Sequence, residues 1–87
     1  MRLRAKVDLN QREIVDALRR VGRSVLLLHQ LGKGIPDLLV GNGEENFLVE
    51  VKLGKGELTP DQIEFHAQWR GPVVVARSAE EAIRLTA

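Results

Sequence analysis

The 87-residue sequence contains no cysteine and no tyrosine, and its aromatic side chains are two phenylalanines and one tryptophan. The absence of cysteine excludes disulfides, thiol nucleophiles and every zinc site that needs a thiolate ligand. The two histidines, His29 and His66, lie far apart in the sequence and cannot build a structural zinc centre alone, so any metal must be bound by oxygen. So few aromatic rings also argue against modules that bind single strands by stacking bases on several exposed rings.

Long hydrophobic segments are missing as well. No uninterrupted aliphatic stretch is longer than that of residues 25–28, whereas a membrane-spanning helix needs roughly 20 apolar residues. The basic N-terminus, residues 1–6, is not followed by the apolar segment of a secretory signal peptide. We therefore expect a single domain over residues 1–87 that is not secreted, has no contact with a membrane and works in the cytoplasm of a bacterial or phage-infected cell.

Charge is distributed unevenly along the chain, although the net charge is only +1. Residues 1–35 carry eight basic and three acidic side chains, whereas residues 36–87 carry five basic and nine acidic ones. A basic region suits a polyanionic partner, and an acidic region suits a cation. The alternative is that exposed helices simply carry charge. The candidate contacts to nucleic-acid phosphates are Arg12, Arg19, Lys33 and Lys55.

Capping and turn residues divide the chain into seven elements. Asn10 to Glu13 has the pattern of a capping box, which predicts a helix that begins there and ends at Gly22. Strands are predicted over residues 24–30, 35–40, 47–53 and 73–76, the last of a wholly apolar kind that is buried on both faces. Two further capping boxes, Thr59 to Gln62 and Ser78 to Glu81, open a helix that reaches about Arg70 and a terminal helix. The order αβββαβα predicts an α/β fold in which helices flank a mixed four-stranded sheet.

The second and third strands should form a hairpin whose apolar pattern is interrupted by Asp37, Glu50 and Lys52. Because side chains alternate between the two faces, pairing residue 38 with 49 and residue 40 with 47 leaves one face entirely apolar and gathers the three charged residues on the other. A slip of one residue would place charge in the apolar face. The pattern therefore predicts Asp37 opposite Glu50, with Cα atoms about 4.5 to 5.5 Å apart.

Two carboxylates that close repel each other unless one is protonated or a cation lies between them. Mg²⁺ suits such a pair, because it keeps several waters and uses one or two protein carboxylates together with substrate phosphate, and Mn²⁺ is expected to substitute for it. Lys52 is one strand period from Glu50, where an ammonium can hold an attacking water or stabilise developing charge. The alternative is a structural ion-pair cluster at the end of the sheet.

Pro36-Asp37, followed after the hairpin by Glu50-Val51-Lys52, resembles the signature of PD-(D/E)XK nucleases. A wider set of segments resembles the VRR-NUC branch of that superfamily, including its small stand-alone phage members: residues 34–40, 47–52, 58–62, 71–75 and 78–82. The resemblance covers roughly residues 10–85. The ordered set, which includes the helix start Leu-Thr-Pro-Asp-Gln, is more specific than the short signature alone.

The resemblance implies a restriction-endonuclease-like core and a metal-dependent endonuclease that hydrolyses DNA and prefers branched or four-way-junction DNA, as Holliday junction resolvases do. It implies that Asp37, Glu50 and the main-chain carbonyl of Val51 bind the metal, that Lys52 is the catalytic lysine and that Gln62 supports the active site. Glu13 falls where many relatives carry an acidic residue that reaches the metal through water. A homodimer without a small-molecule cofactor is also expected, because so short a chain has a small core and a junction needs two symmetric cuts.

Several alternatives stay open. Glu13 and Gln62 are each the third residue of a capping box, so both could instead satisfy a backbone amide. A non-catalytic nucleic-acid-binding module, a nicking or restriction-type nuclease on duplex DNA, and RNA in place of DNA are also compatible with the residues. His66, one turn after Gln62, could face the same site or be an ordinary packed side chain. The remaining interpretations are a flexible loop at residues 32–34, core or dimer contacts at Phe65 and Trp69, and a dimer contact at Val15.

Overall fold

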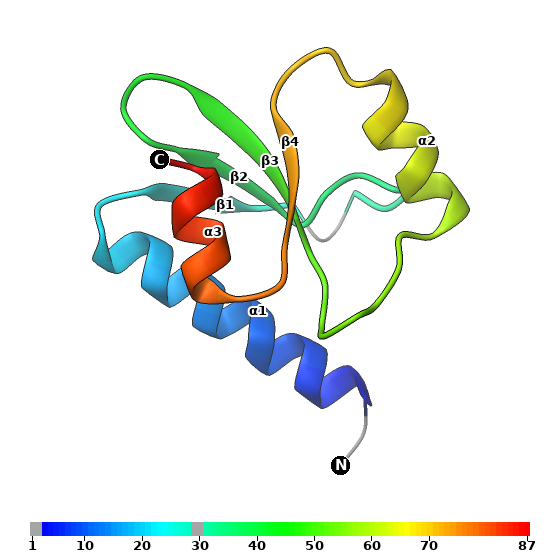
Figure 1. Ribbon diagram of the computed structural model, residues 1–87, viewed down its shortest axis with the longest axis horizontal. Helices are drawn as coiled ribbons and strands as arrows, with labels where there is room; N and C mark the ends of the chain where they lie inside the picture. Colours follow the sequence, from blue (N-terminus) through cyan, green and yellow to red (C-terminus); the bar gives the residue numbers. More distant parts are fainter. Residues whose placement is uncertain (1–2, 29–30) are drawn as a thin grey trace.

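Residues 3–28 and 31–87, the part of the chain that the computed structural model describes, form a mixed four-stranded sheet and three helices (Figure 1). The elements follow one another as α1 (Leu3–Arg20), β1 (Ser24–Leu27), β2 (Leu38–Gly41), β3 (Asn46–Val51), α2 (Pro60–Gln68), β4 (Val73–Ala76) and α3 (Ala79–Leu85). The strands lie side by side in sequence order, with β1, β2 and β3 antiparallel and β4 parallel to β3. The predicted α/β class with a mixed sheet is confirmed, and so is the predicted element order.

The first helix begins seven residues earlier than predicted. The capping-box interpretation of Asn10 is wrong, because Asn10 lies inside α1 and its Nδ2 donates a hydrogen bond to the main-chain oxygen of Lys52 at 3.1 Å. Residues 3–9 contain neither glycine nor proline, so nothing in their backbone chemistry stops the helix from extending toward the N-terminus. The predicted end is confirmed: Gly22 has φ +91°, and the Arg23 N–H donates to the Leu18 carbonyl at 2.9 Å, as in a Schellman motif.

The hairpin has the register that the apolar pattern predicts. Leu38 lies opposite Val49 and Val40 lies opposite Phe47. The strands are shorter than expected, since β2 begins only at Leu38, after the fully buried Pro36, and β3 ends at Val51. Strand β1 ends at Leu27, and residues 29 and 30, the predicted end of that strand, lie outside the described residues.

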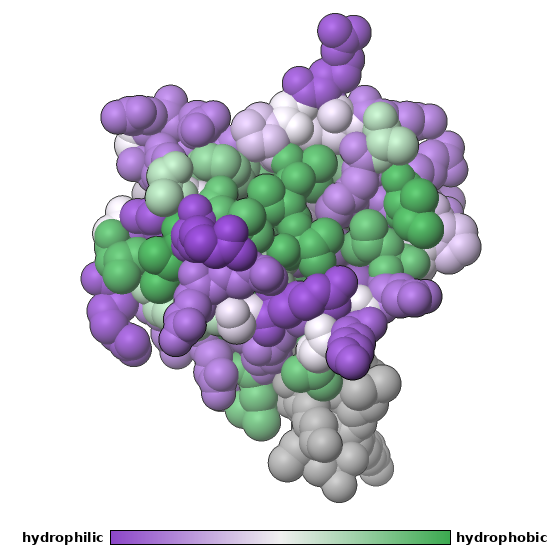
Figure 2. Space-filling model, in the orientation of Figure 1, coloured by the Kyte–Doolittle hydropathy of each residue, from purple (hydrophilic) through white to green (hydrophobic). Residues whose placement is uncertain are grey.

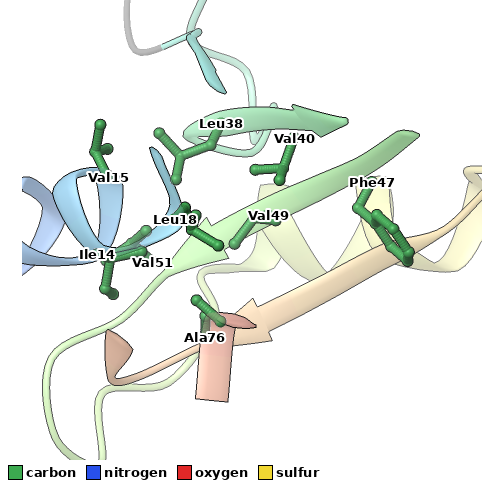
Figure 3. Packing of buried hydrophobic residues seen from close by; sticks show 10 residues of the cluster. Ile14, Val15, Leu18, Leu38, Val40, Phe47, Val49, Val51 and Ala76 are labelled. Carbon is green, nitrogen blue, oxygen red and sulfur yellow. The ribbon is translucent and has the colours of Figure 1, made fainter. Parts of the chain in front are cut away.

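The hydrophobic core lies between α1, α3 and one face of the sheet. Figure 3 shows side chains of α1 pointing at the apolar face of the hairpin and at the end of β4. Val15 is only 6% exposed within this core, so its predicted role as a dimer contact is wrong. The fully buried members of the core are Ile14, Leu18, Leu38, Val40, Val49, Ala76 and Ala82.

Strand β4 is an edge strand, and the prediction that both its faces are buried is wrong. Its valines are half-buried, and only Ala76 is fully enclosed. Figure 2 shows hydrophobic side chains gathered across the middle of one face, over the part of the view where Figure 1 draws β4 and α2. Within the described ranges, no helix is long and apolar enough to cross a membrane.

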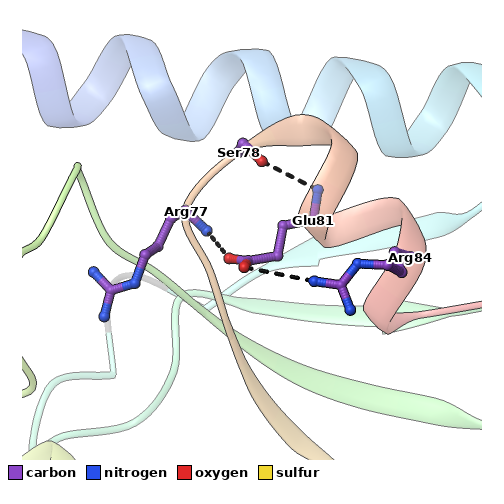
Figure 4. Close-up of polar contacts among 4 residues, drawn as sticks. All are labelled: Arg77, Ser78, Glu81 and Arg84. Atoms are coloured by element: carbon purple, nitrogen blue, oxygen red, sulfur yellow. Dashed lines mark hydrogen bonds and ion pairs between the residues drawn. The ribbon is translucent and has the colours of Figure 1, made fainter.

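The junction between β4 and α3 is held by short-range polar contacts (Figure 4). Ser78 caps α3 as predicted, with its Oγ accepting a hydrogen bond from the Glu81 N–H at 3.1 Å. The side chain of Glu81 accepts the N–H of Arg77 at 2.7 Å, one residue before the cap, and lies 3.7 Å from the Arg84 guanidinium. Carboxylates at the start of a helix also interact favourably with the positive end of the helix dipole. These contacts together fix the junction between β4 and α3.

Candidate active site

Asp37 lies directly before β2, and its side chain is directed toward β3. Its Oδ2 accepts a hydrogen bond from the main-chain N–H of Val51 at 2.8 Å, while its own carbonyl accepts one from Leu28 at 2.7 Å. The preceding Pro36 is buried and fixes the backbone at the point from which the carboxylate projects. The aspartate is therefore held at the end of the β2–β3 pair that is remote from the hairpin turn.

Glu50 lies on β3 and is only 3% exposed. Its Oε2 accepts a hydrogen bond from Gln62 Nε2 at 3.3 Å, whereas its buried Oε1 has no partner among the described residues. Burial, followed by the hydrogen bond and the charge of Asp37, raises the pKa of Glu50 to about 8, although the charge of Lys52 acts in the opposite direction. Without a cation, Glu50 therefore carries a proton at neutral pH and shares it with Asp37, which relieves the repulsion that the sequence predicts.

Lys52 follows β3 on the same face as Glu50. Its N–H donates to the Ala76 carbonyl at 3.1 Å and its carbonyl accepts the amide of Asn10, so β4 and α1 fix its backbone from two sides. Its charge lowers the pKa of Glu50, which requires the ammonium to lie near that carboxyl group. Among residues 9–28 and 31–87, whose side chains the structure describes, the ion pair that is found joins Arg84 to Glu81, and Lys52 takes part in none. Asp37, Glu50 and Lys52 therefore do not form the structural ion-pair cluster that was the alternative.

Gln62 completes a capping box and also contacts Glu50, so the two interpretations that the sequence left open do not exclude each other. Its Oε1 accepts the Thr59 N–H at 2.9 Å while its own N–H donates to Thr59 Oγ1 at 3.3 Å, which completes the capping box of α2. The Nε2 that this arrangement leaves free donates to Glu50. One amide therefore anchors the start of α2 and orients the buried carboxyl group.

Three groups offer oxygen ligands to a cation: Asp37, Glu50 and the main chain of Val51. The N–H and C=O of one strand residue point to the same side, and the Val51 N–H points at Asp37, so the Val51 carbonyl faces that side too. Because Oε1 of Glu50 has no hydrogen-bond partner among the described residues, it can bind a cation without breaking a hydrogen bond. These hard donors fit Mg²⁺ or Mn²⁺. In the described part of the chain no three His, Asp or Glu side chains form a metal-binding group, so water and phosphate would have to complete the coordination.

Glu13 lies on α1, one turn after Asn10, and is exposed. Because Asn10 is not the N-cap, the interpretation of Glu13 as a capping residue is wrong. The turn that carries Glu13 crosses the end of β3, where Asn10 contacts Lys52. Glu13 forms no direct ligand group with Asp37 and Glu50, and its contact with the metal through water stays a prediction.

The four basic residues predicted to contact nucleic acid are exposed and lie on α1 and on the loops before β2 and after β3: Arg12, Arg19, Lys33 and Lys55. The guanidinium of Arg19 is partly engaged within the protein, because its Nη2 donates a hydrogen bond to the Val25 carbonyl at 3.2 Å. Among the side chains that the structure describes, the other three take part in no ion pair. Their binding of phosphates stays a prediction.

Two residues that the sequence analysis did not assign to the site turn out to hold it together. Arg77 Nη1 donates to the carbonyls of Gly54 and Gly56, at 2.9 and 2.7 Å, and so fastens the loop that follows Lys52. Gly34 has φ +76°, and a Cβ there would overlap the main-chain carbonyl of Asp61 in α2. The interpretation of residues 32–34 as a flexible loop is therefore wrong at Gly34. No local pattern marks either contact, because the partners lie more than 20 residues away.

Comparison with known proteins gives no match to a protein family, to a curated protein or to a solved structure. A function for this chain has to be argued from the residues of the site.

Proposed function

We propose that this protein is a metal-dependent phosphodiesterase, an endonuclease that hydrolyses DNA and prefers branched or four-way-junction DNA. The observation that carries the proposal is the pairing of Asp37 with the buried Glu50, whose Oε1 is unpartnered, beside the charge of Lys52. The resemblance to PD-(D/E)XK nucleases of the VRR-NUC branch, with their restriction-endonuclease-like core, supports it. So does the order αβββαβα, in which β2 and β3 bring the signature residues together.

In this proposal Asp37, Glu50 and the main-chain carbonyl of Val51 hold Mg²⁺ or Mn²⁺. A bound cation would supply an acidified water as nucleophile and would offset the negative charge of the phosphodiester. Glu50 has to release its proton for that purpose, and the amide of Gln62 keeps Oε2 occupied so that Oε1 is directed at the cation. The ammonium of Lys52 orients the attacking water and stabilises the charge that develops on phosphate.

A second copy of the chain would complete the enzyme. Resolution of a junction takes two cuts in strands of like polarity, and a two-fold homodimer presents two identical sites in opposite orientation. Apolar residues that the fold leaves exposed provide the contact surface, among them Leu26, Ile63 and Trp69. We expect such an enzyme to meet its DNA in the cytoplasm of a bacterial or phage-infected cell.

The competing function is a nucleic-acid-binding module that keeps the nuclease fold without catalysis. A buried carboxyl oxygen without a partner costs about 1–3 kcal/mol, and binding alone gives no reason to retain that cost. The observation therefore favours the enzyme. A nicking nuclease on plain duplex shares the same chemistry and differs only in substrate preference and in the number of cuts.

The test is a cleavage panel of the purified protein with Mg²⁺, Mn²⁺ or EDTA on duplex, single-stranded, flap and four-way-junction DNA, with RNA versions of the same substrates. We expect cleavage that needs the metal and is strongest on the junction. Asp37→Asn and Glu50→Gln should each lower the rate by at least about 100-fold, since each removes a ligand of the catalytic ion. Lys52→Met should lower it to a similar degree while calorimetry still detects Mn²⁺ binding.

Glu45→Gln is the matched control, because Glu45 is an exposed carboxylate at the opposite end of the hairpin. It should cleave at the rate of the parent protein. Cleavage that survives both Asp37→Asn and Glu50→Gln would overturn the site. DNA binding without cleavage on any substrate would make the binding module the correct function.

A further inference from the structure

His66 shares a face of α2 with Gln62. The two residues are four positions apart, one helical turn, so their side chains lie one above the other along the helix. Gln62 reaches Glu50, which establishes that this face looks onto the end of β3. The positive charge of Lys52 acts on His66 as well, so the imidazole lies on the same side of the molecule as the ammonium.

The Nε2 atom of His66 is buried and has no hydrogen-bond partner among the described residues. Buried polar atoms are nearly always paired in folded proteins, so an exception calls for a physical reason. Burial and the nearby charge of Lys52 both lower the pKa of His66, which keeps the ring neutral. A neutral imidazole has one nitrogen that donates and one that accepts. Beside an ammonium, the accepting nitrogen is the one that is stable.

Lys52 supplies the complementary half of this contact. Its ammonium has three N–H donors and no acceptor, and none of the side chains described at residues 9–28 and 31–87 forms an ion pair with it. The flexible side chain carries about 2 kcal/mol of rotamer entropy, so an ammonium that must point at a reacting water gains from a fixed anchor. Two buried acceptors near it are unpartnered, Glu50 Oε1 and His66 Nε2. The Glu50 carboxyl group is already engaged by Gln62 and by Asp37, whereas His66 Nε2 has no partner among the described residues, so the anchor is His66.

We propose that His66 is a positioning residue: its Nε2 accepts one N–H of the Lys52 ammonium and so aims the other two at the attacking water and the phosphate. The catalytic purpose of this contact rests on the proposed function, but the contact itself does not. It assigns α2 a second task besides orienting Glu50. The two residues of one helix face then control the two groups of β3 that do the chemistry, Gln62 through Glu50 and His66 through Lys52.

The contact can be tested without any activity. The ¹⁵N NMR signals of the His66 ring can be assigned in labelled, metal-free protein because they disappear in His66→Gln. Their chemical shifts should show a proton on Nδ1 and an unprotonated Nε2 that accepts a hydrogen bond. Lys52→Met should abolish that hydrogen bond and return the ring to the Nε2–H form that free histidine prefers. The proposed contact would be rejected if the His66 ring of the parent protein carried its proton on Nε2. It would also be rejected if the nitrogen shifts of the ring were the same in Lys52→Met.

The purpose of the contact is tested by kinetics on the metal-loaded enzyme. His66→Phe keeps the ring shape without an acceptor and should lower kcat by about 10- to 100-fold at unchanged KM, because small misplacements of a catalytic group have effects of that size. His66→Gln returns an acceptor to the Nε2 position and should recover most of the rate. In the Lys52→Met background, His66→Phe should change nothing further.

Gln68→Leu is the matched control on the same helix, since Gln68 is exposed and its Nε2 donates to the nearby Glu64 Oε1, at 3.4 Å. A raised KM at normal kcat in His66→Phe would make His66 a substrate contact instead. An equal penalty in the Lys52→Met background would also reject positioning through the lysine. If the parent protein cleaves nothing, the proposed function fails, while the nitrogen shifts still decide whether His66 holds Lys52.

Discussion

Burying a carboxyl group such as Glu50 is unfavourable unless the group is neutral, hydrogen-bonded or paired with a cation. The fold meets this requirement in part. Gln62 satisfies one oxygen, Asp37 shares the proton, and the other oxygen has no partner among the described residues. Under the proposed function, this arrangement would be stable in two states, with a proton on Glu50 or with a cation in place of that proton. At the scale of single residues, we therefore expect the site to exchange a proton for a metal ion.

This exchange predicts how stability depends on pH. In metal-free protein the folded-state pKa of Glu50 is about 8, above its ordinary value of 4.5, so the folded state binds the additional proton between these limits. Its stabilising effect is complete below the lower value and is lost as pH rises through the upper one. In EDTA, Tm should therefore fall between pH 6.5 and 8, by roughly 4–8 °C for each kcal/mol lost in a domain of this size.

Glu50→Gln cannot release a proton, so its Tm should be nearly flat over the same interval. The interval begins at 6.5 because His66, whose pKa is lowered, contributes the opposite slope below its ordinary value. Added Mn²⁺ should raise Tm of the parent protein at pH 8 and leave that of Glu50→Gln almost unchanged. An equal pH slope in both proteins would mean that another group titrates.

At the scale of elements, α2 is held mainly by its first turn. None of its residues is buried, and Figure 1 shows it apart from α1 and α3. The first turn is fixed by the capping box of Thr59, by the bond from Gln62 to Glu50 and by the close approach of Gly34. The loop before Asp37 and the helix that orients Glu50 are thus locked together at one point, so a change at Gly34 should disturb both carboxylates.

Gly34→Ala tests this joint. A left-handed φ costs an alanine about 1–2 kcal/mol, and the overlap with the Asp61 backbone should add about 1–3 kcal/mol. Gly32→Ala is the control, because Gly32 has a similar φ of +65° and open space around it. Urea unfolding should therefore show a clearly larger loss for Gly34→Ala, together with weaker Mn²⁺ binding. Equal losses of unfolding free energy in the two variants would mean that the loop at Gly34 accommodates the added methyl group without displacing α2.

At the scale of the whole molecule, apolar residues stay exposed on the sheet face opposite the core. The registers place Leu26, Leu39, Leu48 and Val73 in one row across the four strands. Leu48 is buried, but Leu26 at the edge is 58% exposed. Ile63 of α2 is 56% exposed, and Trp69, which caps the end of that helix, is 50% exposed. Trp69 stacks on Phe65 with ring centroids 5.3 Å apart, which makes a rigid apolar surface on that helix. This surface is our candidate for the dimer interface.

Sedimentation should accordingly give a particle of about twice 9.7 kDa at micromolar concentration. Leu26→Glu should dissociate it, because a charge cannot be buried there without a partner. Leu9→Glu is the control, since Leu9 is 48% exposed on α1. Paired symmetric nicks in junction DNA should become single uncoupled nicks in Leu26→Glu. A monomeric parent protein that makes single nicks would favour the nicking nuclease on duplex DNA.

Local patterns predicted much of this molecule, because their physical causes act within a few residues. Period-two alternation determines the register that brings Asp37 to Glu50, since any slip would bury charge. Gly22, Thr59 and Ser78 end or begin helices through bonds to backbone atoms at most five positions away. The element order and the meeting of the two carboxylates follow from such signals alone.

The tertiary structure decided what depends on distant partners. Asn10 has the pattern of a cap but contacts Lys52, 42 residues away, so the start of α1 could not be deduced from its neighbours. The burial of Val15, the fixed loop at Gly34 and the tether from Arg77 likewise exist only once the helices pack on the sheet. Whether His66 faces the site was open for the same reason: helical spacing gives a residue its face, and only packing brings that face within range of the charge of Lys52.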